Sequence, residues 1–439
     1  MHPQNNVWRP WRAALLAAAA GLVLAACGGS DSGGGSASIR LVNLTSSNAS
    51  FDLVTVDDDD DEHELASTIA ADAASERSGV AAGERSYQLR RAGNDTAVVT
   101  SSWSLTAGLT YTAIAYGAEG SLKMAMLEED EDEPDSGKAR LRVYNTSSDA
   151  GALDLYLTDA GADTDLDDAA ITTTVGAASS TGFVTLSPGT RRLRLTASGD
   201  NADLRLDLPE ITLAAGDITT LIVTAGPGGV LVHAATLQQA GGLVAYKNSS
   251  ARVRVAAGVA DNAAVLASVG GQAVGGSQRA PSVGSYRLVT AGDGLALQTT
   301  VNGVALDAQT VALKAGGDYT LVVHGSPAAA AAALLTDDNR LPTASTKAKL
   351  RLVNALVGLD NGLTLSLNYS ALAIDVLSGA GSDYATTTSA TDVPLEVTSP
   401  LSSTALFSIT EADITGYGVY TVFMLGSGSS PYGTLRKDR

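Results

Sequence analysis

The amino-acid sequence predicts an all-β protein made of four similar antiparallel β-sandwiches in tandem. Three observations lead to this prediction. One short motif recurs four times at intervals of roughly 100 residues, apolar and polar residues alternate with a period of two, and turn-forming pairs separate the alternating runs. The chain has 439 residues, so it is long enough for several separate hydrophobic cores.

The recurring motif places a small residue before alternating basic and apolar residues. Its four copies begin at Ala37, Ala139, Ala251 and Ala348 and read ASIRLVN, ARLRVYN, ARVRVAA and AKLRLVN. The third copy departs most, because Ala256-Ala257 stands where the others have a larger residue followed by Asn. Four copies at even spacing indicate four units of one type.

A second motif closes each repeat with an apolar, β-branched run, which in the first three copies follows a turn. It occupies residues 107–117, 215–226, 315–325 and 420–426. Between the two motifs, Leu alternates with polar residues, as in 153–157 and 363–367, which puts the Leu side chains on one face of a strand. The pairs Pro188-Gly189 and Asn302-Gly303 supply turns between such runs.

Short alternating strands in units of about 100 residues are typical of immunoglobulin-like antiparallel β-sandwiches. The expected Ig-like repeats span residues 37–127, 139–240, 251–338 and 348–439, and an acidic linker spans 128–138. Four sandwiches placed end to end could reach well beyond the lipid headgroups, although the sequence does not give their relative orientation.

The N-terminal segment has the pattern of an export signal. Arg9 and Arg12 precede a wholly apolar or small-residue run over 13–26, too short to span a membrane. The run ends in Leu24-Ala25-Ala26-Cys27-Gly28, which resembles the lipobox of bacterial lipoproteins.

The pattern therefore predicts a lipoprotein signal peptide at residues 1–26, lipidation of Cys27 and a Gly/Ser tether at 27–36. Gly28 is not the Asp that resembles an inner-membrane retention signal. We therefore expect an exported protein that a lipid holds in the outer membrane, on its periplasmic face or at the cell surface.

Composition excludes several classes of partner and cofactor. Lys and Arg total 28 against 47 for Asp and Glu, a net charge of −19, which disfavours binding to nucleic-acid phosphates. A single Cys excludes a disulfide framework, a Cys-based zinc site and an iron–sulfur cluster. We expect membrane and envelope or surface proteins as partners, no nucleic acid, and no cofactor other than a candidate Ca²⁺ ion.

The motifs resemble a known family. The opening ARLRVYNTSSDAGALDLYL and the closing LAAGDITTLIVTAG of the second repeat are similar to those of domain of unknown function 4397, and the second repeat matches best. The resemblance implies Ig-like repeats in a secreted or lipid-anchored bacterial protein. The family has no accepted catalytic residues, so the resemblance implies none here.

The best candidate metal ligands are four aspartates of the second repeat: Asp159, Asp163, Asp165 and Asp167. The spacing of the last three imitates the first half of a calcium-binding loop. The second half fails, because Asp168 replaces the required Gly and Thr174 replaces the bidentate Glu. We interpret a second acidic run, Asp57–Asp61 beside His63, as a solvated loop.

The opening strands also carry basic residues: Arg40, Arg140, Arg142, Arg252, Arg254, Lys349 and Arg351. We expect these side chains to face solvent near a sheet edge, where they would block edge-to-edge aggregation. Asp52 and Asp154 are candidate cross-strand partners for them. We expect His233 and His324 to be sheet residues rather than metal ligands.

These observations favour a non-catalytic lipoprotein of the cell envelope that acts as an interaction or spacer module. No nucleophile elbow, phosphate-binding glycine loop or second zinc ligand after His63 is found in the sequence. Two alternatives remain open: a surface adhesin made rigid by Ca²⁺, and an envelope enzyme that uses the Asp-rich loops of repeats 1 and 2.

Overall fold

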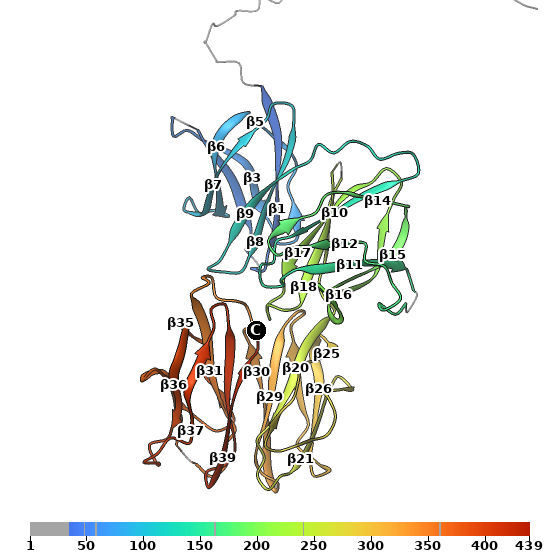
Figure 1. Cartoon of the computed structure of the whole chain (residues 1–439). Coiled ribbons are helices and arrows are strands. Elements are labelled where there is room, and N and C mark those ends of the chain that lie inside the picture. Colours follow the sequence, from blue (N-terminus) through green and yellow to red (C-terminus); the bar gives the residue numbers. More distant parts are fainter. Residues whose placement is uncertain (1–34, 48, 58, 162–163, 240, 360) are drawn as a thin grey trace, which may run out of the picture.

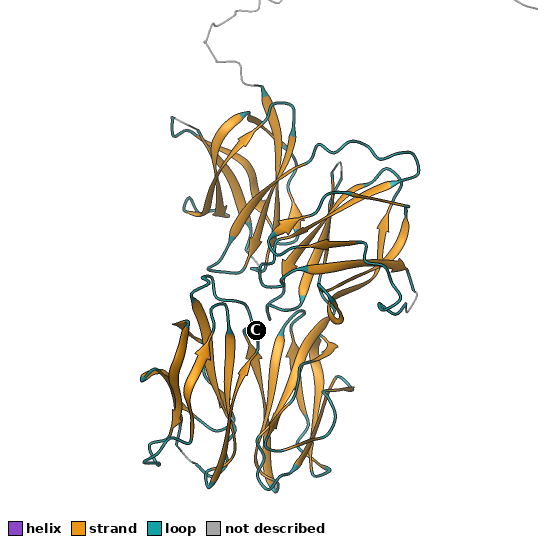
Figure 2. Cartoon of the chain, viewed as in Figure 1, coloured by secondary structure: helices purple, strands orange, loops and turns teal. Residues whose placement is uncertain are grey.

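The computed structural model describes residues 35–47, 49–57, 59–161, 164–239, 241–359 and 361–439. These residues form strands and loops without any helix (Figure 2), so the all-β prediction is confirmed. Within these ranges no helix is long and apolar enough to cross a membrane. The predicted signal peptide, Cys27 and most of the predicted tether lie outside the described residues.

The first half of the chain forms two units of two sheets each (Figure 1). The strands of unit 1 are β1 (Ser36–Thr45), β2 (Phe51–Val56), β3 (Glu62–Ile69), β4 (Ala73–Ala74), β5 (Ser78–Ala81), β6 (Gly83–Arg91), β7 (Ala97–Leu105), β8 (Thr110–Gly117) and β9 (Lys123–Glu128). The strands of unit 2 are β10 (Ala139–Asn145), β11 (Leu153–Asp159), β12 (Thr173–Val175), β13 (Ser179–Ser180), β14 (Val184–Leu186), β15 (Gly189–Ala197), β16 (Asp200–Leu213), β17 (Ile218–Ala225), β18 (Val232–Gln238) and β19 (Leu243–Tyr246).

The second half repeats this arrangement. The strands of unit 3 are β20 (Ser250–Ala257), β21 (Ala264–Val269), β22 (Gln272–Ala273), β23 (Gln278–Arg279), β24 (Ser282–Val283), β25 (Arg287–Thr290), β26 (Gly292–Val301), β27 (Val304–Ala305), β28 (Gln309–Leu313), β29 (Asp318–Ser326) and β30 (Ala329–Asp337). The strands of unit 4 are β31 (Lys347–Asn354), β32 (Leu363–Leu367), β33 (Ser370–Val376), β34 (Ala380–Gly381), β35 (Ala385–Thr388), β36 (Ala390–Thr398), β37 (Phe407–Ile414), β38 (Val419–Ser427) and β39 (Ser430–Lys437).

One strand order recurs in all four units. In unit 4, one sheet has the order β34/β35-β31-β38-β39 and the other has the order β33-β32-β36-β37. The segment from β33 to β35 therefore leaves one sheet and joins the other, and we call it the crossing segment of the unit. The same segment runs from β3 to β5 in unit 1, from β12 to β14 in unit 2 and from β22 to β25 in unit 3.

The sandwiches are antiparallel, as predicted, except for one parallel pair of strands in each unit. The opening and closing strands of each unit pair in parallel, as β1 does with β8 over Ser38–Thr45 and β31 does with β38. Parallel neighbours need a long connection between them, and the whole second sheet of each unit supplies it. All other strand pairs within the named sheets are antiparallel.

Each unit has its own core between its two sheets. In unit 1 the inward side chains of β1, Ile39 and Leu41, pack with Phe51 and Leu53 of β2, and all four are fully buried. Separate core clusters of the same kind fill units 2, 3 and 4. The alternation in the sequence therefore places apolar residues as expected.

The outer faces of the opening sheets are also covered, because the units pack in pairs. Val42 and Leu44 of unit 1 cluster with Ile222 and Leu237 of unit 2. A second cluster joins Ala256 and Val322 of unit 3 to Val353, Phe423 and Leu425 of unit 4. Units 1 and 2, and units 3 and 4, consequently lie side by side and not end to end (Figure 1).

The Asn that ends the opening motif ties the end of that strand to neighbouring loops. The Asn43 side-chain amide donates to the carbonyls of Ala49 at 3.1 Å and Ile69 at 2.9 Å. Asn145 and Asn354 make equivalent bonds in units 2 and 4. Unit 3 has Ala257 at this position, and the preceding Ala256 leaves room for the Phe423 ring of unit 4.

The Asn302-Gly303 pair forms the predicted turn. Both residues have positive φ, 49° and 82°, and they connect the paired residues Val301 and Val304. Two successive left-handed residues are the signature of a type I′ hairpin turn.

Candidate functional site

Four positions repeat in every unit on the outer face of the opening sheet. They are an arginine on the opening strand, a threonine opposite it on the closing strand, a residue in the crossing segment, and a residue at or just after the end of the strand that follows the closing strand and pairs with it. The sets are Arg40, Thr112, Arg77 and Glu129 in unit 1; Arg142, Thr220, Phe183 and Gln239 in unit 2; Arg254, Thr320, Tyr286 and Asp337 in unit 3; and Arg351, Thr421, Tyr384 and Asp438 in unit 4.

Each arginine is oriented by the threonine beside it. The arginine Nε donates to the threonine Oγ1 at 2.9 Å in units 1, 2 and 3 and at 3.2 Å in unit 4. This bond leaves the two terminal nitrogens of the guanidinium pointing toward the neighbouring unit, where a carboxylate or carbonyl can accept them.

Two reciprocal salt bridges join units 3 and 4. Arg254 of unit 3 donates to both oxygens of Asp438 of unit 4, at 2.5 and 3.1 Å. Arg351 of unit 4 donates to Asp337 of unit 3. The four side chains are 0–4% exposed, so the junction is a buried, two-fold-like ionic lock.

Tyrosines cover this lock on both sides. The Arg254 guanidinium lies 4.4 Å from the centre of the Tyr286 ring, and that of Arg351 lies 4.7 Å from the Tyr384 ring. The Tyr286 hydroxyl donates to Asp337 at 2.5 Å. Burial raises the pKa of Tyr286 well above its usual range, so this hydroxyl keeps its proton and acts as a donor to the carboxylate.

The junction between units 1 and 2 has the same geometry but different chemistry. Glu129 is buried and accepts from Arg40 at 2.7 Å and from Arg77 at 2.6 Å. Gln239 takes the acidic position of unit 2, so Arg40 donates to backbone carbonyls there, including that of Gln238 at 3.0 Å. Arg142 in turn donates to the carbonyl of Glu128 at 2.9 Å. A single carboxylate thus replaces two.

The prediction that the basic residues face solvent near a sheet edge was wrong. The opening strands are central in their sheets, and Arg40, Arg254 and Arg351 are 2–5% exposed. The expected partners were wrong as well. Asp52 accepts from the backbone of Thr68, and Asp154 accepts from Thr174, Ser198 and Gly199. The other basic residues pair as Arg140 with Glu131, Arg252 with Asp318 and Lys349 with Asp338.

The two pairs of units meet where units 2, 3 and 4 converge. The Gly228 N–H donates to the Gly316 carbonyl at 3.0 Å, and the Leu341 N–H donates to Asp149 at 3.1 Å. Arg439 of unit 4 donates to the Gly229 carbonyl of unit 2 at 3.0 Å, near the end marked C in Figure 1. Contacts of this kind join the four units into one body.

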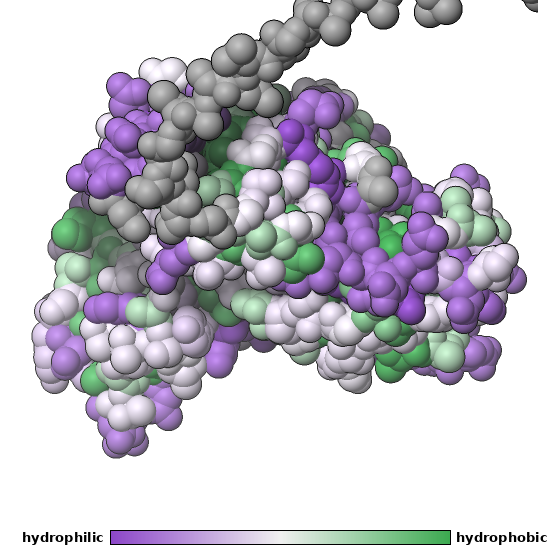
Figure 3. Space-filling view, turned by 90° about the horizontal axis from the view of Figure 1, so that it is seen from above, coloured by the Kyte–Doolittle hydropathy of each residue, from purple (hydrophilic) through white to green (hydrophobic). Residues whose placement is uncertain are grey.

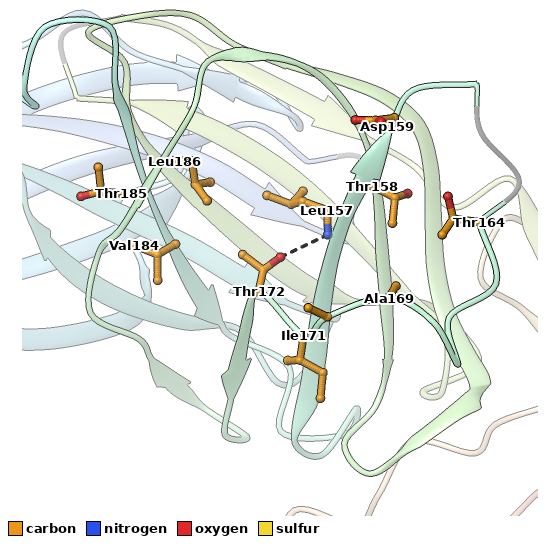
Figure 4. Close-up of a pocket in the computed structure, with 11 residues that line it drawn as sticks. Leu157, Thr158, Asp159, Thr164, Ala169, Ile171, Thr172, Val184, Thr185 and Leu186 are labelled. Atoms are coloured by element: carbon orange, nitrogen blue, oxygen red, sulfur yellow. Dashed lines mark hydrogen bonds between the residues drawn. The ribbon is translucent and has the colours of Figure 1, made fainter.

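A groove opens in unit 2 at the crossing segment, where β12 and β14 diverge into different sheets (Figure 4). Its volume is about 550 Å³. Aliphatic side chains and threonine hydroxyls alternate along its wall, among them Leu157, Ile171 and Leu186 with Thr172 and Thr185. The Leu157 N–H donates to the Thr172 hydroxyl at 3.2 Å, which holds the floor of the groove in place.

Asp159, one of the predicted metal ligands, lines this groove, and the described candidates each bond to a different partner. Asp159 pairs with Arg191 at 2.5 Å, Asp167 accepts from Asn201 at 2.6 Å, and Asp165 accepts from the backbone of Asp167. Asp163 lies outside the described residues. Among the residues that the structure describes, no group of three His, Cys, Asp or Glu is placed to hold a metal ion.

The acidic loop after β2 closes on itself. Asp57 accepts from the backbone N–H groups of Asp59 at 3.1 Å and Asp61 at 2.9 Å. His63 lies 3.9 Å from Asp57 and its side chain is 64% exposed. Seen from the end of the molecule where unit 1 lies, hydrophilic residues gather in several areas of the surface (Figure 3).

His233 and His324 lie in β18 and β29, so their prediction as sheet residues is confirmed. The Asn248 N–H donates to Nδ1 of His233 at 3.0 Å. Burial lowers the pKa of His233 to about 4, and the neighbouring Lys247 acts in the same direction. His233 is therefore neutral at the unit 2–unit 3 boundary.

Sequence reasoning missed the four-position sets, although part of the signal was present. The arginines at the same place in each opening motif were recognised, but their threonine, aromatic and acidic companions lie 30 to 90 residues away along the chain. A comparison of the four repeats position by position would have found Thr112, Thr220, Thr320 and Thr421 opposite them.

Comparison with known proteins identifies a family. A sequence model described as Domain of unknown function (DUF4397) matches residues 35–156 and 251–358, which together are just over half of the chain. The matches cover units 1 and 3 and run into the first strands of units 2 and 4, so the expectation that unit 2 matches best was wrong. No curated protein matches the chain.

Several solved structures are similar in fold. A proposed cell adhesion protein from Bacteroides uniformis is 15% identical, and the match covers 46% of this chain and 99% of that one with a TM-score of 0.20. BcpA, the major pilin subunit of Bacillus cereus, is 10% identical, with 66% and 98% coverage and a TM-score of 0.14.

Replacing Arg351 with Met should destabilise the protein strongly. The change leaves the buried Asp337 with the more distant Arg254, at 3.7 Å, as its cation, and removing one partner of a buried ion pair costs about 3–5 kcal/mol. Urea unfolding would measure the loss. Arg191→Met is the matched control, because its partner Asp159 is 82% exposed and exposed pairs contribute about 0–1 kcal/mol. Equal effects of the two changes would refute the lock.

His233 should make the protein sensitive to mild acid. The unfolded state takes up a proton near pH 6.5, whereas the folded state resists until about pH 4. The free energy of unfolding should therefore fall as the pH drops through this window, by up to ~1.4 kcal/mol per pH unit. His233→Gln should lose this component in urea unfolding at a series of pH values, and His63→Gln should retain it. Identical pH profiles for the parent and His233→Gln would contradict this assignment.

Proposed function

Because the chain belongs to the DUF4397 family, we propose that it is a non-catalytic binding protein of the bacterial cell envelope. In this proposal it is exported by the leader at residues 1–26 and held in the outer membrane by a lipid on Cys27. The groove of unit 2 receives an extended segment of a partner protein.

The observation that carries the proposal is the groove on a body of locked units. Unit 2, which carries the groove, accepts a hydrogen bond at the Gln238 carbonyl from the buried Arg40 of unit 1, and a buried charge cannot leave its acceptors without a large cost. A binding surface on such a body keeps its shape before the partner arrives, which reduces the entropy lost on binding.

The lining of the groove favours an extended polypeptide. Ile171 is 49% exposed and offers an apolar contact, while the hydroxyls of Thr158, Thr164 and Thr185 can bond main-chain amides. The neighbouring strand β14 lies at the edge of its sheet, and an extended peptide can add to such an edge. The groove is open, which suits a segment of a longer chain.

The position of the first strand supports attachment at one end. In Figure 1, β1 begins at the end of unit 1 that is farthest from units 3 and 4. A tether that precedes Ser36 would therefore leave units 3 and 4 distant from the membrane and the side of unit 2 accessible.

Cys27→Ala should release the protein from the membrane fraction. The thiol is the sole cysteine of the chain and the only group available for thioether lipidation. Fractionation followed by immunoblotting measures the shift, and Ser30→Ala, a change in the tether, is the control that should stay with the membrane. A Cys27→Ala protein that remains membrane-bound would contradict anchoring by a lipid on Cys27.

Ile171→Asp should abolish capture of the partner. A photo-reactive residue placed at Thr185 in the lipidated protein should cross-link to a protein in native membranes, and the adduct should disappear when Ile171 becomes Asp, since a carboxylate would have to be desolvated against the apolar segment. Ile374→Asp in unit 4 is the control, because Ile374 is also exposed, at 72%. An adduct that survives Ile171→Asp, or that Ile374→Asp also removes, would disprove binding at the groove.

A further inference from the structure

The outer edge of unit 1 differs from the other long edges of the protein. β7 (Ala97–Leu105) is the last strand of its sheet and pairs only with β6. Among the described residues, its backbone makes no hydrogen bond beyond those to β6. The outward N–H and C=O groups along nine residues are therefore free to pair with another strand.

Natural edge strands usually carry charges, proline or a covering segment that prevents such pairing. In the part of the chain that the structure describes, the other edge strands longer than six residues follow this rule. β3, β16, β33 and β37 carry acidic residues, and β39 has Pro431 and basic residues. β30 ends in Asp337, its Leu335 lies against Gly381 of unit 4, and Gln309 donates to the Ala332 carbonyl at 3.3 Å.

Apart from a bulge at Val98, where its register with β6 shifts, β7 has none of these devices. Its sequence AVVTSSWSL contains no charged residue and no proline. Its residues alternate between half-buried and exposed until the buried Leu105, and from Val99 to Leu105 they pair with β6 without a register shift. Val98, at the bulge, is 38% exposed. The edge is thus long and uncharged, and it is regular from Val99 to Leu105.

We propose that β7 is a dimerisation edge that pairs antiparallel with β7 of a second copy of this chain. The sequence of the strand is complementary to itself when Ser101 lies on the two-fold axis. Val99 then faces Trp103 of the other copy on the core side, and Thr100 faces Ser102 on the solvent side. Cross-strand aromatic and β-branched pairs, and pairs of hydroxyl residues, are favourable.

The pairing makes one continuous eight-stranded sheet from the two four-stranded sheets of unit 1. It also extends the contact of Trp103, which already packs on Tyr87 with ring centroids 5.5 Å apart. No like charges oppose each other in this register, which is why a second copy fits despite the net charge of −19.

The test uses the whole chain with Cys27→Ala, so that lipid does not drive association. Sedimentation equilibrium should find that this protein is a dimer. The dissociation constant of the dimer should rise at least tenfold in Thr100→Lys/Ser102→Lys, because each new lysine would face a lysine of the other copy. Ser408→Lys/Thr410→Lys on β37 is the matched control, because Ser408 and Thr410 are exposed residues of another edge strand. This control variant should remain dimeric. Circular dichroism checks that every variant is folded.

A cysteine at the two-fold position tests the register. Ser101→Cys in the same background should form a reducible covalent dimer under mild oxidation, and Thr410→Cys should not. A parent that stays monomeric up to ~100 μM would overturn the proposal. A dimer that persists in Thr100→Lys/Ser102→Lys would overturn it too. So would a dimer in which Ser101→Cys does not cross-link while a strand of another protein occupies the edge in membranes.

Discussion

The architecture depends on how a guanidinium can be buried on the outer face of a sheet. Taking one out of water costs several kcal/mol unless its nitrogens find acceptors. The threonine on the adjacent closing strand satisfies Nε, and the remaining nitrogens find acceptors in the neighbouring unit, as Arg254 does with Asp438 and Arg351 with Asp337. An isolated unit of this kind would leave buried guanidinium nitrogens without the acceptors that the neighbouring unit supplies, so the units are complete only in pairs.

The pairs have diverged within this common scheme. In units 3 and 4, each unit gives one arginine and one carboxylate and receives the same from the other. In units 1 and 2, Arg77 stands where units 3 and 4 place a tyrosine, and Gln239 stands where they place an acid. The extra cation and the missing anion are compensated by sharing Glu129 and by backbone carbonyls. The same geometry therefore tolerates two charge patterns, which makes wrong pairing of units less favourable.

Much of the fold could be predicted from the sequence, because alternation and turns are local. Leu153 and Leu155 enter the core of unit 2 as their spacing predicts, and Asn302-Gly303 turns the chain between β26 and β27. The arginines were misjudged because basic and apolar alternation looks alike whether the basic face meets water or another unit. Arg351 and Asp337 lie only 14 residues apart, yet they belong to different units. The groove could not be predicted either, since it arises where β12 and β14 join different sheets.

The parallel pairing of the first strand has a mechanical consequence. β1 is the first strand of the body, and eight of its residues, Ser38 to Thr45, pair in register with β8. Tension applied at the N-terminal end of β1 acts along the strands and not along the hydrogen bonds that join them. The hydrogen bonds would therefore have to rupture together under shear, whereas a hairpin at the same place could peel open one bond at a time.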